Sequence, residues 1–338
     1  MALHDLGSRE WLDQVMEEII DPEREIVDPH HHLWNDEGRR FDYVLEDLWT
    51  DMDSGHNVKK TVFIQCRSNY RSEGPEHLQP VGESEFVAGL AADSRRGAEN
   101  QARIAGIVAH ANLTLGDQVA EILDAHEKVG RGQFKGIRHA GAWAENREGL
   151  MNPAEWEKDL FQREDFRQGV RMLGSRGLTY ESWHYHYQNK DYIQLAKAVP
   201  DTVIILDHFG TPLGVGSYMG KREEIFREWK KDMVELAKCD NVVAKLGGLA
   251  MPDNGFGWHL RELPPTSDEF VEAQRAYYLH TIECFGPDRC MFESNFPVDR
   301  LSISYHVLWN GFKKMVADFS ESEKEAMFSG TASRVYSL

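Results

Sequence analysis

The sequence predicts a (β/α)₈ barrel, the TIM-barrel fold, formed by a single domain over residues 1–338. Eight short runs rich in β-branched residues recur along the chain, and amphipathic stretches long enough for a helix separate most of them. The length of 338 residues also suits one barrel with insertions. The rival arrangement is an open doubly wound sheet, but its usual G-x-G-x-x-G turn after the first strand is missing from the sequence.

The predicted elements follow one another in regular order. Residues 8–23 predict a surface helix, because their apolar side chains recur at helical spacing opposite acidic ones. The eight predicted strands are 25–28, 60–65, 103–109, 134–138, 177–183, 202–207, 241–246 and 289–294. The stretches 116–129 and 221–238 predict helices that cover the barrel. After the seventh strand, the Gly- and Pro-rich segment 248–267 predicts a long capping loop, with a purely structural loop as the alternative.

Composition restricts the classes of partner. The chain has 38 Lys and Arg residues against 56 Asp and Glu, a net charge of −18, which argues against binding to nucleic acid or to anionic membrane surfaces. The N-terminal stretch lacks the features of a signal peptide, and no apolar run approaches the roughly 20 residues of a membrane span. Four cysteines without C-x-x-C pairing suit a reducing compartment. We therefore expect a soluble, cytoplasmic protein that acts on a small molecule and forms a homo-oligomer.

Polar residues gather where the predicted strands end. In a barrel of this type the carboxyl ends of all strands meet at one mouth, and catalytic groups lie there. The residues concerned are His30 and His32, Gln65 and Arg67, His110 and Asn112, Arg138 and His139, His184 and His186, Asp207 and His208, Lys245, and Glu293 and Asn295. This convergence predicts an active site at the mouth.

The run "DPHHH" predicts two histidines that face the same way. Side chains alternate along a strand, so His30 and His32 point together while His31 turns away into a structural position. Two such imidazoles and a third from His186 or His208 could bind one divalent cation, zinc or manganese. The alternative is a polar pocket in which the pair only forms hydrogen bonds.

Six strand-end motifs resemble those of the amidohydrolase superfamily: "IVDPHHHLWN", "FKGIRH", "SWHYHYQ", "VIILDHFGTPLG", "VVAKLGGL" and "MFESNFPVD". The chain resembles most closely the amidohydrolase-related branch, with its sugar-lactone and pyrone-dicarboxylate lactonases, and more distantly its metal-dependent decarboxylases. The resemblance implies that His30, His32, His186 and His208 are metal ligands. Asn295 departs from it, since the family usually has an aspartate there that completes the metal site and activates water.

The remaining site residues are assigned from their chemistry. An amide is scarcely basic, so Asn295 cannot serve as the usual base, and Glu293 or His208 is expected to replace it. Strand alternation is expected to place Glu293 on the same inward face as Asn295, at a position where the family usually has a small residue. A buried ion pair with an arginine or lysine is the alternative role for Glu293. Arg138 is expected to stabilise a developing oxyanion. The expected substrate-binding side chains are Arg67, His139, His184, Trp258 and His259.

These residues predict a hydrolase that opens a lactone or related cyclic ester, with water attack assisted by a metal or by the histidines and arginine. The substrate is expected to be cyclic and either carboxylated or polyhydroxylated. Two alternatives stay open. A decarboxylase of an aromatic or muconate-type acid needs no water-activating base, so the asparagine harms it less. A barrel that has kept the pocket and lost the chemistry would bind a ligand without turnover.

Overall fold

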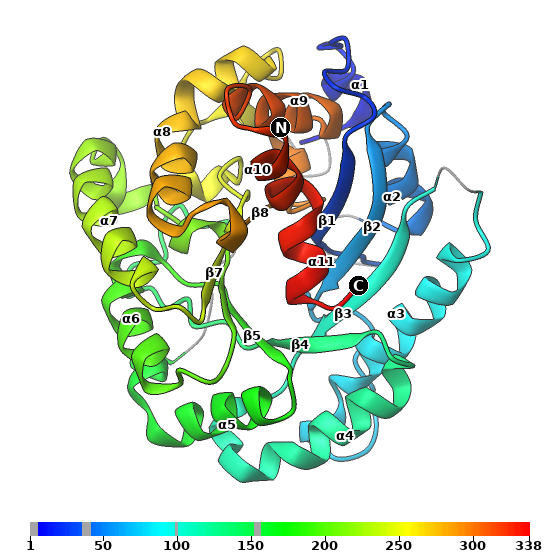
Figure 1. The fold of residues 1–338 in the computed structure, drawn as a ribbon, viewed down its shortest axis with the longest axis vertical. Coiled ribbons are helices and arrows are strands. Elements are labelled where there is room, and N and C mark those ends of the chain that lie inside the picture. The colour runs from blue at the N-terminus through cyan, green and yellow to red at the C-terminus, as the bar shows by residue number, and fades with distance from the viewer. Residues whose placement is uncertain (1–5, 36–41, 99–100, 152–156) are drawn as a thin grey trace.

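The computed structural model describes residues 6–35, 42–98, 101–151 and 157–338. Eight parallel strands form one sheet in chain order, with the helices arranged around it (Figure 1). The fold is therefore the predicted (β/α)₈ barrel. Its strands are β1 (Glu25–His31), β2 (Asn57–Ile64), β3 (Arg103–Ala109), β4 (Phe134–Arg138), β5 (Thr179–Ser182), β6 (Ile204–Leu206), β7 (Val242–Leu246) and β8 (Cys290–Phe292).

The barrel closes through the ends of its first and last strands. The His32 amide donates to the Phe296 carbonyl at 2.8 Å, and the Asn295 amide donates to the His30 carbonyl at 3.0 Å. The residues just after β8 therefore lie against the histidines that end β1, which brings two of the predicted site segments together at the seam of the barrel.

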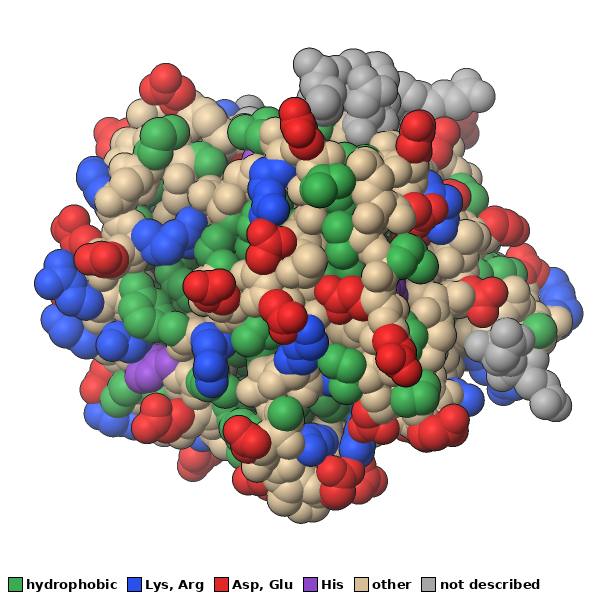
Figure 2. Space-filling model, turned by 90° about the horizontal axis from the view of Figure 1, so that it is seen from above, with side chains coloured by type: hydrophobic (Ala, Val, Ile, Leu, Met, Phe, Trp, Pro, Cys, Tyr) green, Lys and Arg blue, Asp and Glu red, His purple; other side chains and the backbone are tan. Residues whose placement is uncertain are grey.

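The helices of the outer layer are α1 (Arg9–Leu12), α2 (Leu45–Met52), α3 (Val81–Ser94), α4 (Val119–Gly130), α5 (Glu164–Ser175), α6 (Asn189–Ala198), α7 (Arg222–Ala237), α8 (Ser267–Phe285), α9 (Tyr305–Met315), α10 (Glu321–Glu325) and α11 (Thr331–Val335). The large core lies between the strands and these helices. A smaller apolar cluster lies inside the barrel, where α11 and the following Tyr336 pack against Val27, Val243 and Met291. On the face drawn in Figure 2, acidic side chains are spread among basic ones.

The predicted N-terminal helix is wrong beyond its first turn. The helix α1 ends at Leu12, and Met16, expected on the buried face, is 69% exposed. The backbone further along is held by side chains of α9: the Glu17 amide donates to His306, and the Ile20 amide donates to Asn310 at 3.0 Å. Partners distant in the sequence thus replace the hydrogen bonds that a helix would have supplied.

The segment after β7 is ordered by its neighbours. It contains two short 3₁₀ turns and ends at Thr266, which caps α8. Trp258 is only 6% exposed and packs against Phe256 and Phe270, so it belongs to the core. Of the two alternatives for this segment, a capping loop or a purely structural one, the burial of Trp258 favours the structural loop. None of the described helices combines the length and apolar character that crossing a bilayer requires.

Candidate active site

The end of β1 places two imidazoles edge to face in the barrel. His30 and His32 are buried, and their Nε2 atoms lie 3.3 Å apart. The His32 Nδ1 atom lies 2.8 Å from the Ile64 carbonyl, so it carries the proton and leaves the lone pair on Nε2. His31 turns the other way and contacts Thr61 at 2.9 Å. The alternation predicted for "DPHHH" is confirmed.

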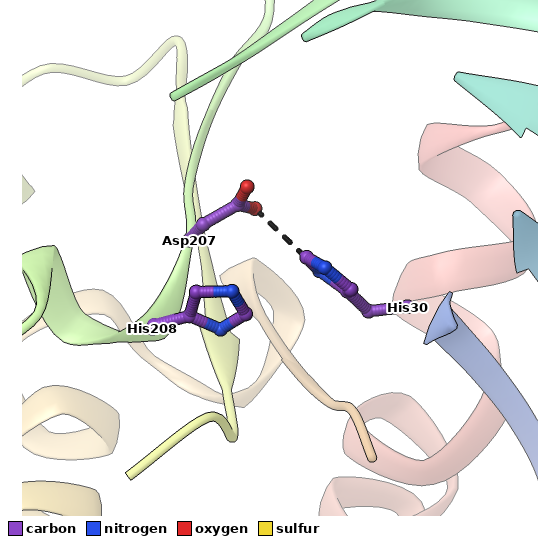
Figure 3. Close-up of side chains that lie close together, drawn as sticks. All are labelled: His30, Asp207 and His208. Atoms are coloured by element: carbon purple, nitrogen blue, oxygen red, sulfur yellow. Dashed lines mark ion pairs between the residues drawn. The ribbon is translucent and has the colours of Figure 1, made fainter. Parts of the chain in front are cut away.

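The end of β6 supplies an acid and a third imidazole. Asp207 and His208 are buried beside His30, and Figure 3 shows the three side chains converging on one point. His208 has a φ of 51°, a left-handed backbone conformation that is uncommon for residues with a side chain. A Cβ on Gly248 would lie 2.1 Å from the His208 ring, so the glycine leaves room for this imidazole.

Glu293 joins the two histidine-bearing strands. Its Oε1 lies 2.7 Å from the His208 Nδ1, its Oε2 lies 2.7 Å from the His30 Nδ1, and it is fully buried. A Cβ on Gly247 would come within 2.2 Å of the Glu293 carbonyl oxygen and 2.4 Å of the Glu293 Cγ, so both the backbone and the side chain of Glu293 require glycine here. Glu293 thus lies between two imidazoles. Its alternative role as the buried ion-pair partner of a lysine also has support, since the Lys245 Nζ lies 3.9 Å from its Oε2.

Arg138, at the end of β4, adds a cation to the same cluster. Its NH1 lies 3.3 Å from the His30 Nε2 and 3.6 Å from Asp207, and its NH2 donates to the Gln65 carbonyl. Arg138 is 8% exposed and His32 and His208 are 4% and 3% exposed, whereas the rest of the cluster is fully buried. A substrate would therefore meet these three side chains first.

Asn295 takes a different direction from the one predicted. Its φ of 55° breaks the strand alternation, and its side-chain amide donates to the buried Asp299 at 2.8 Å. Asn295 and Glu293 were expected to share one face, but each has its own partner. Asp299, which the sequence reasoning missed, also accepts a hydrogen bond from the Ala250 amide. The sequence feature that could have indicated this contact is the spacing of four residues between Asn295 and Asp299.

Two other predicted histidines lie in different surroundings. His186 accepts a hydrogen bond from the Leu213 amide at 3.3 Å, and its ring contacts Tyr218, so its recorded partners are not those of the His30 cluster. His184 has both ring nitrogens occupied, by Ser182 and by Asn189 at 3.1 Å each. These contacts give His184 a structural role and leave it no nitrogen for a substrate.

The other predicted substrate-binding residues differ in their exposure. Arg67 has an exposed side chain and a φ of 63°, in the loop that follows β2. His139 is buried and accepts a hydrogen bond from the Leu113 amide at 3.1 Å. Trp258 belongs to the core, and His259 beside it is half-buried. Their roles toward a substrate stay predictions.

The histidines of the cluster differ in the direction of their pKa shifts. Burial lowers the pKa of His30 and His32 well below the ordinary value, which keeps both imidazoles neutral. Burial acts on His208 in the same direction, but the charge and the hydrogen bond of Glu293 outweigh it and raise the pKa of His208. His208 is therefore the histidine of this group best suited to hold a proton near neutral pH.

The same side chains suit a divalent cation. His30, Asp207 and His208 bring three ligand atoms within 4.8 Å of one another. Both Asp207 oxygens are buried with no hydrogen-bond donor in the described part of the chain. Tetrahedral zinc with Zn–N distances of about 2.0–2.1 Å would hold two nitrogens roughly 3.3 Å apart, which matches the separation of His30 and His32. The donor set thus fits the predicted ion, with Asp207 as a ligand that the sequence reasoning did not assign.

Comparisons with known proteins agree on the family to which the chain is similar. The family model described as "Amidohydrolase" matches residues 27–338. The uncharacterized protein y4mH of Sinorhizobium fredii is 31% identical over 92% of this chain and 98% of its own length. An L-fucono-1,5-lactonase from Burkholderia multivorans is 24% identical over 92% of this chain and 96% of its own length.

Solved structures share the fold. A zinc-bound amidohydrolase from Burkholderia multivorans has a TM-score of 0.70 at 23% identity, over 93% of this chain and 99% of its own. A 5-carboxyvanillate decarboxylase from Sphingomonas paucimobilis has a TM-score of 0.55 at 11% identity, with the same coverage. At these identities the likeness concerns the barrel and not the reaction.

Proposed function

The chain belongs to the amidohydrolase family, and on that premise we propose that it is a hydrolase that opens a lactone or a related cyclic ester. The observation that carries the proposal is the His208–Glu293 pair, whose 2.7 Å contact lies in a buried cluster beside Arg138. The L-fucono-1,5-lactonase relative supports a lactone as the substrate class.

The pair provides a general base without an aspartate at position 295. Glu293 holds the Nδ1–H of His208, so the opposite nitrogen can accept a proton from water as the water oxygen attacks the lactone carbonyl. The carboxylate then stabilises the imidazolium, as the acid of a catalytic triad does. Collapse of the tetrahedral intermediate breaks the bond to the ring oxygen, and His208 returns the proton to this leaving group. The products are a carboxylic acid and an alcohol in one chain.

Arg138 is placed to assist the same step. Its guanidinium borders His30 and is the most exposed cation of the cluster, so it can donate to the oxyanion that forms on the carbonyl. A divalent cation, which His30, His32 and Asp207 would hold, supplies Lewis-acid polarisation of that carbonyl when bound. The zinc bound in the Burkholderia multivorans structure supports a divalent metal as the ion. The same cationic face suits a carboxylated or polyhydroxylated substrate.

The reaction class is tested by product analysis in oxygen-18 water with a panel of sugar lactones and pyrone carboxylates. One labelled oxygen in the ring-opened acid is expected. Release of carbon dioxide without label in an acid would identify a decarboxylase, and binding without turnover would identify a ligand-binding barrel.

The base is tested with Glu293→Gln, which keeps the shape and removes the charge beside His208. A positioned base typically contributes about 10² to 10⁴-fold, so kcat should fall at least about 100-fold. Glu83→Gln is the matched control, because Glu83 is also buried but contacts the backbone of Cys66 and Ser68 instead. Near-normal kcat in Glu293→Gln would refute the assignment.

A further inference from the structure

A second polar layer lies inside the barrel next to the active-site cluster. It consists of Glu181 from β5, Lys245 from β7 and Tyr336, which follows α11. All three are buried, and the Tyr336 ring belongs to the apolar cluster inside the barrel. Arg334 and Thr331 in α11 bond to the carbonyls of Asp288 and Pro287, just before β8, so this helix covers the end of the barrel where the strands begin (Figure 1).

Lys245 is the centre of this layer. Its Nζ lies 2.6 Å from Glu181, 3.5 Å from Asp207 and 3.9 Å from Glu293, and it also contacts the His30 Nδ1 at 3.2 Å. Burial alone would lower the pKa of Lys245, but the three carboxylates outweigh it and raise the pKa. The position of this ammonium decides which carboxylate it neutralises.

Glu181 holds the ammonium away from Glu293, and it is itself held from the far end of the barrel. One carboxylate oxygen of Glu181 accepts the hydrogen bond of Lys245, and the other accepts the hydroxyl of Tyr336. The Lys245 Nζ also lies 5.8 Å from the centre of the Tyr336 ring, within the range of a cation–π contact. The link from Tyr336 through Glu181 and Lys245 thus reaches His30 across the barrel interior.

We propose that Tyr336 is a positioning residue of the active site, which fixes Glu181 so that Lys245 stays on that carboxylate and beside His30, and leaves Glu293 to orient His208. The proposal rests on the hydrolase function proposed above. Without the hydroxyl, the buried Glu181 carboxylate loses one of its two recorded donors and can turn, and a shift of little more than an ångström would bring Lys245 to Glu293. Lys245 would then leave the Nδ1 of His30 and compete with the Nδ1 of His208 for Glu293, so both imidazoles would change their surroundings.

The test compares Tyr336→Phe with Tyr192→Phe. Tyr192 is also buried, and its hydroxyl donates to the Ile205 carbonyl at 2.9 Å, so the control removes one buried hydrogen bond outside the link. The first readout is the ring nitrogen-15 resonances of His30 and His208 in histidine-labelled protein, assigned by their loss in His30→Asn and His208→Asn. Both sets should shift in Tyr336→Phe and stay unchanged in Tyr192→Phe.

The second readout is turnover of a lactone that the wild type opens. In Tyr336→Phe we expect kcat to fall about tenfold with KM unchanged, since the hydroxyl touches no substrate. Unshifted His30 and His208 resonances in Tyr336→Phe, or equal shifts in both variants, would overturn the proposal. If the wild type opens no lactone, the hydrolase function fails while the resonances still decide the positioning role. Should Tyr336→Phe fail to fold, Glu181→Gln breaks the same link and should shift the same His30 and His208 resonances.

Discussion

Asn295→Asp restores the residue that the family usually carries, and the structure predicts that it will destabilise this protein at alkaline pH. The side-chain amide of Asn295 donates to Asp299 at 2.8 Å, so the substitution places two carboxylates in contact. At an effective dielectric constant of 20, two like charges at this distance repel by about 6 kcal/mol. The pair will therefore keep one proton instead of ionising fully.

The pH dependence follows from linkage. Burial raises the pKa of Asp299 from 3.8 to about 7, so the folded wild type binds a proton that the unfolded chain has lost, and stability falls as pH rises through this window. Above pH 7 this contribution is constant in the wild type. In Asn295→Asp the retained proton extends the loss by about 1.4 kcal/mol per pH unit, or about 2.7 kcal/mol between pH 7 and 9.

Thermal unfolding measures this difference. An unfolding entropy of about 2.1 cal/mol/K per residue gives about 0.7 kcal/mol/K for the 338-residue chain, so the gap in Tm between wild type and variant should widen by about 4 °C from pH 7 to 9. The matched control is the exchange Asn295→Asp/Asp299→Asn, which keeps one amide and one carboxylate and should remove the widening. A gap that is constant with pH, or that persists in the exchange, would refute the reasoning.

Three further substitutions test the surroundings of the site. Gly247→Ala should displace Glu293 and lower kcat at least about tenfold, since the new Cβ would lie 2.4 Å from the Glu293 Cγ. The control is Gly89→Ala, a helical position with open space around it, which should stabilise the protein by about 1 kcal/mol and leave kcat unchanged. Equal kcat values in the two variants would contradict the displacement of Glu293. Burial raises the pKa of Glu83 from 4.5 to about 7, so the contribution of this group to the free energy of unfolding falls as the pH rises from 4.5 to 7. Relative to the wild type, the free energy of unfolding of Glu83→Gln should therefore rise by up to about 3 kcal/mol between pH 4.5 and 7.5. A difference that does not vary with pH would count against the pKa shift. Trp258→Ala should lower the free energy of unfolding by about 3–5 kcal/mol in denaturant, because the side chain is only 6% exposed and lies in the core. An unchanged denaturation midpoint would instead favour the capping-loop alternative.

The barrel could be predicted because its strands are buried on both faces and read as β-branched runs. All eight predicted runs overlap the observed strands. The N-terminal helix failed for the opposite reason: its sequence has helical spacing, but the backbone around Glu17 and Ile20 finds partners on α9, nearly 290 residues away. Local spacing gives no information on such distant partners.

The site could be predicted only where the backbone is extended. Alternation correctly paired His30 with His32, because β1 extends through His31, although its register against β2 shifts between Asp28 and His31. It failed for Glu293 and Asn295, since β8 ends at Phe292 and Asn295 has a φ of 55°. The left-handed residue turns its side chain to Asp299, and a rule based on a period of two cannot anticipate that turn.

The departures from the family pattern around β8 are physically coupled. The resemblance puts a small residue at position 293 and an aspartate at 295, whereas this chain has glutamate and asparagine. An aspartate at 295 would repel the buried Asp299, so the amide suits that neighbour. A carboxylate lies instead two residues earlier, where Glu293 comes within 2.7 Å of both His30 and His208. Glu293 and Asn295 are therefore best understood as two coupled departures, in which the carboxylate at position 293 lies against the histidines and the amide at position 295 donates to Asp299.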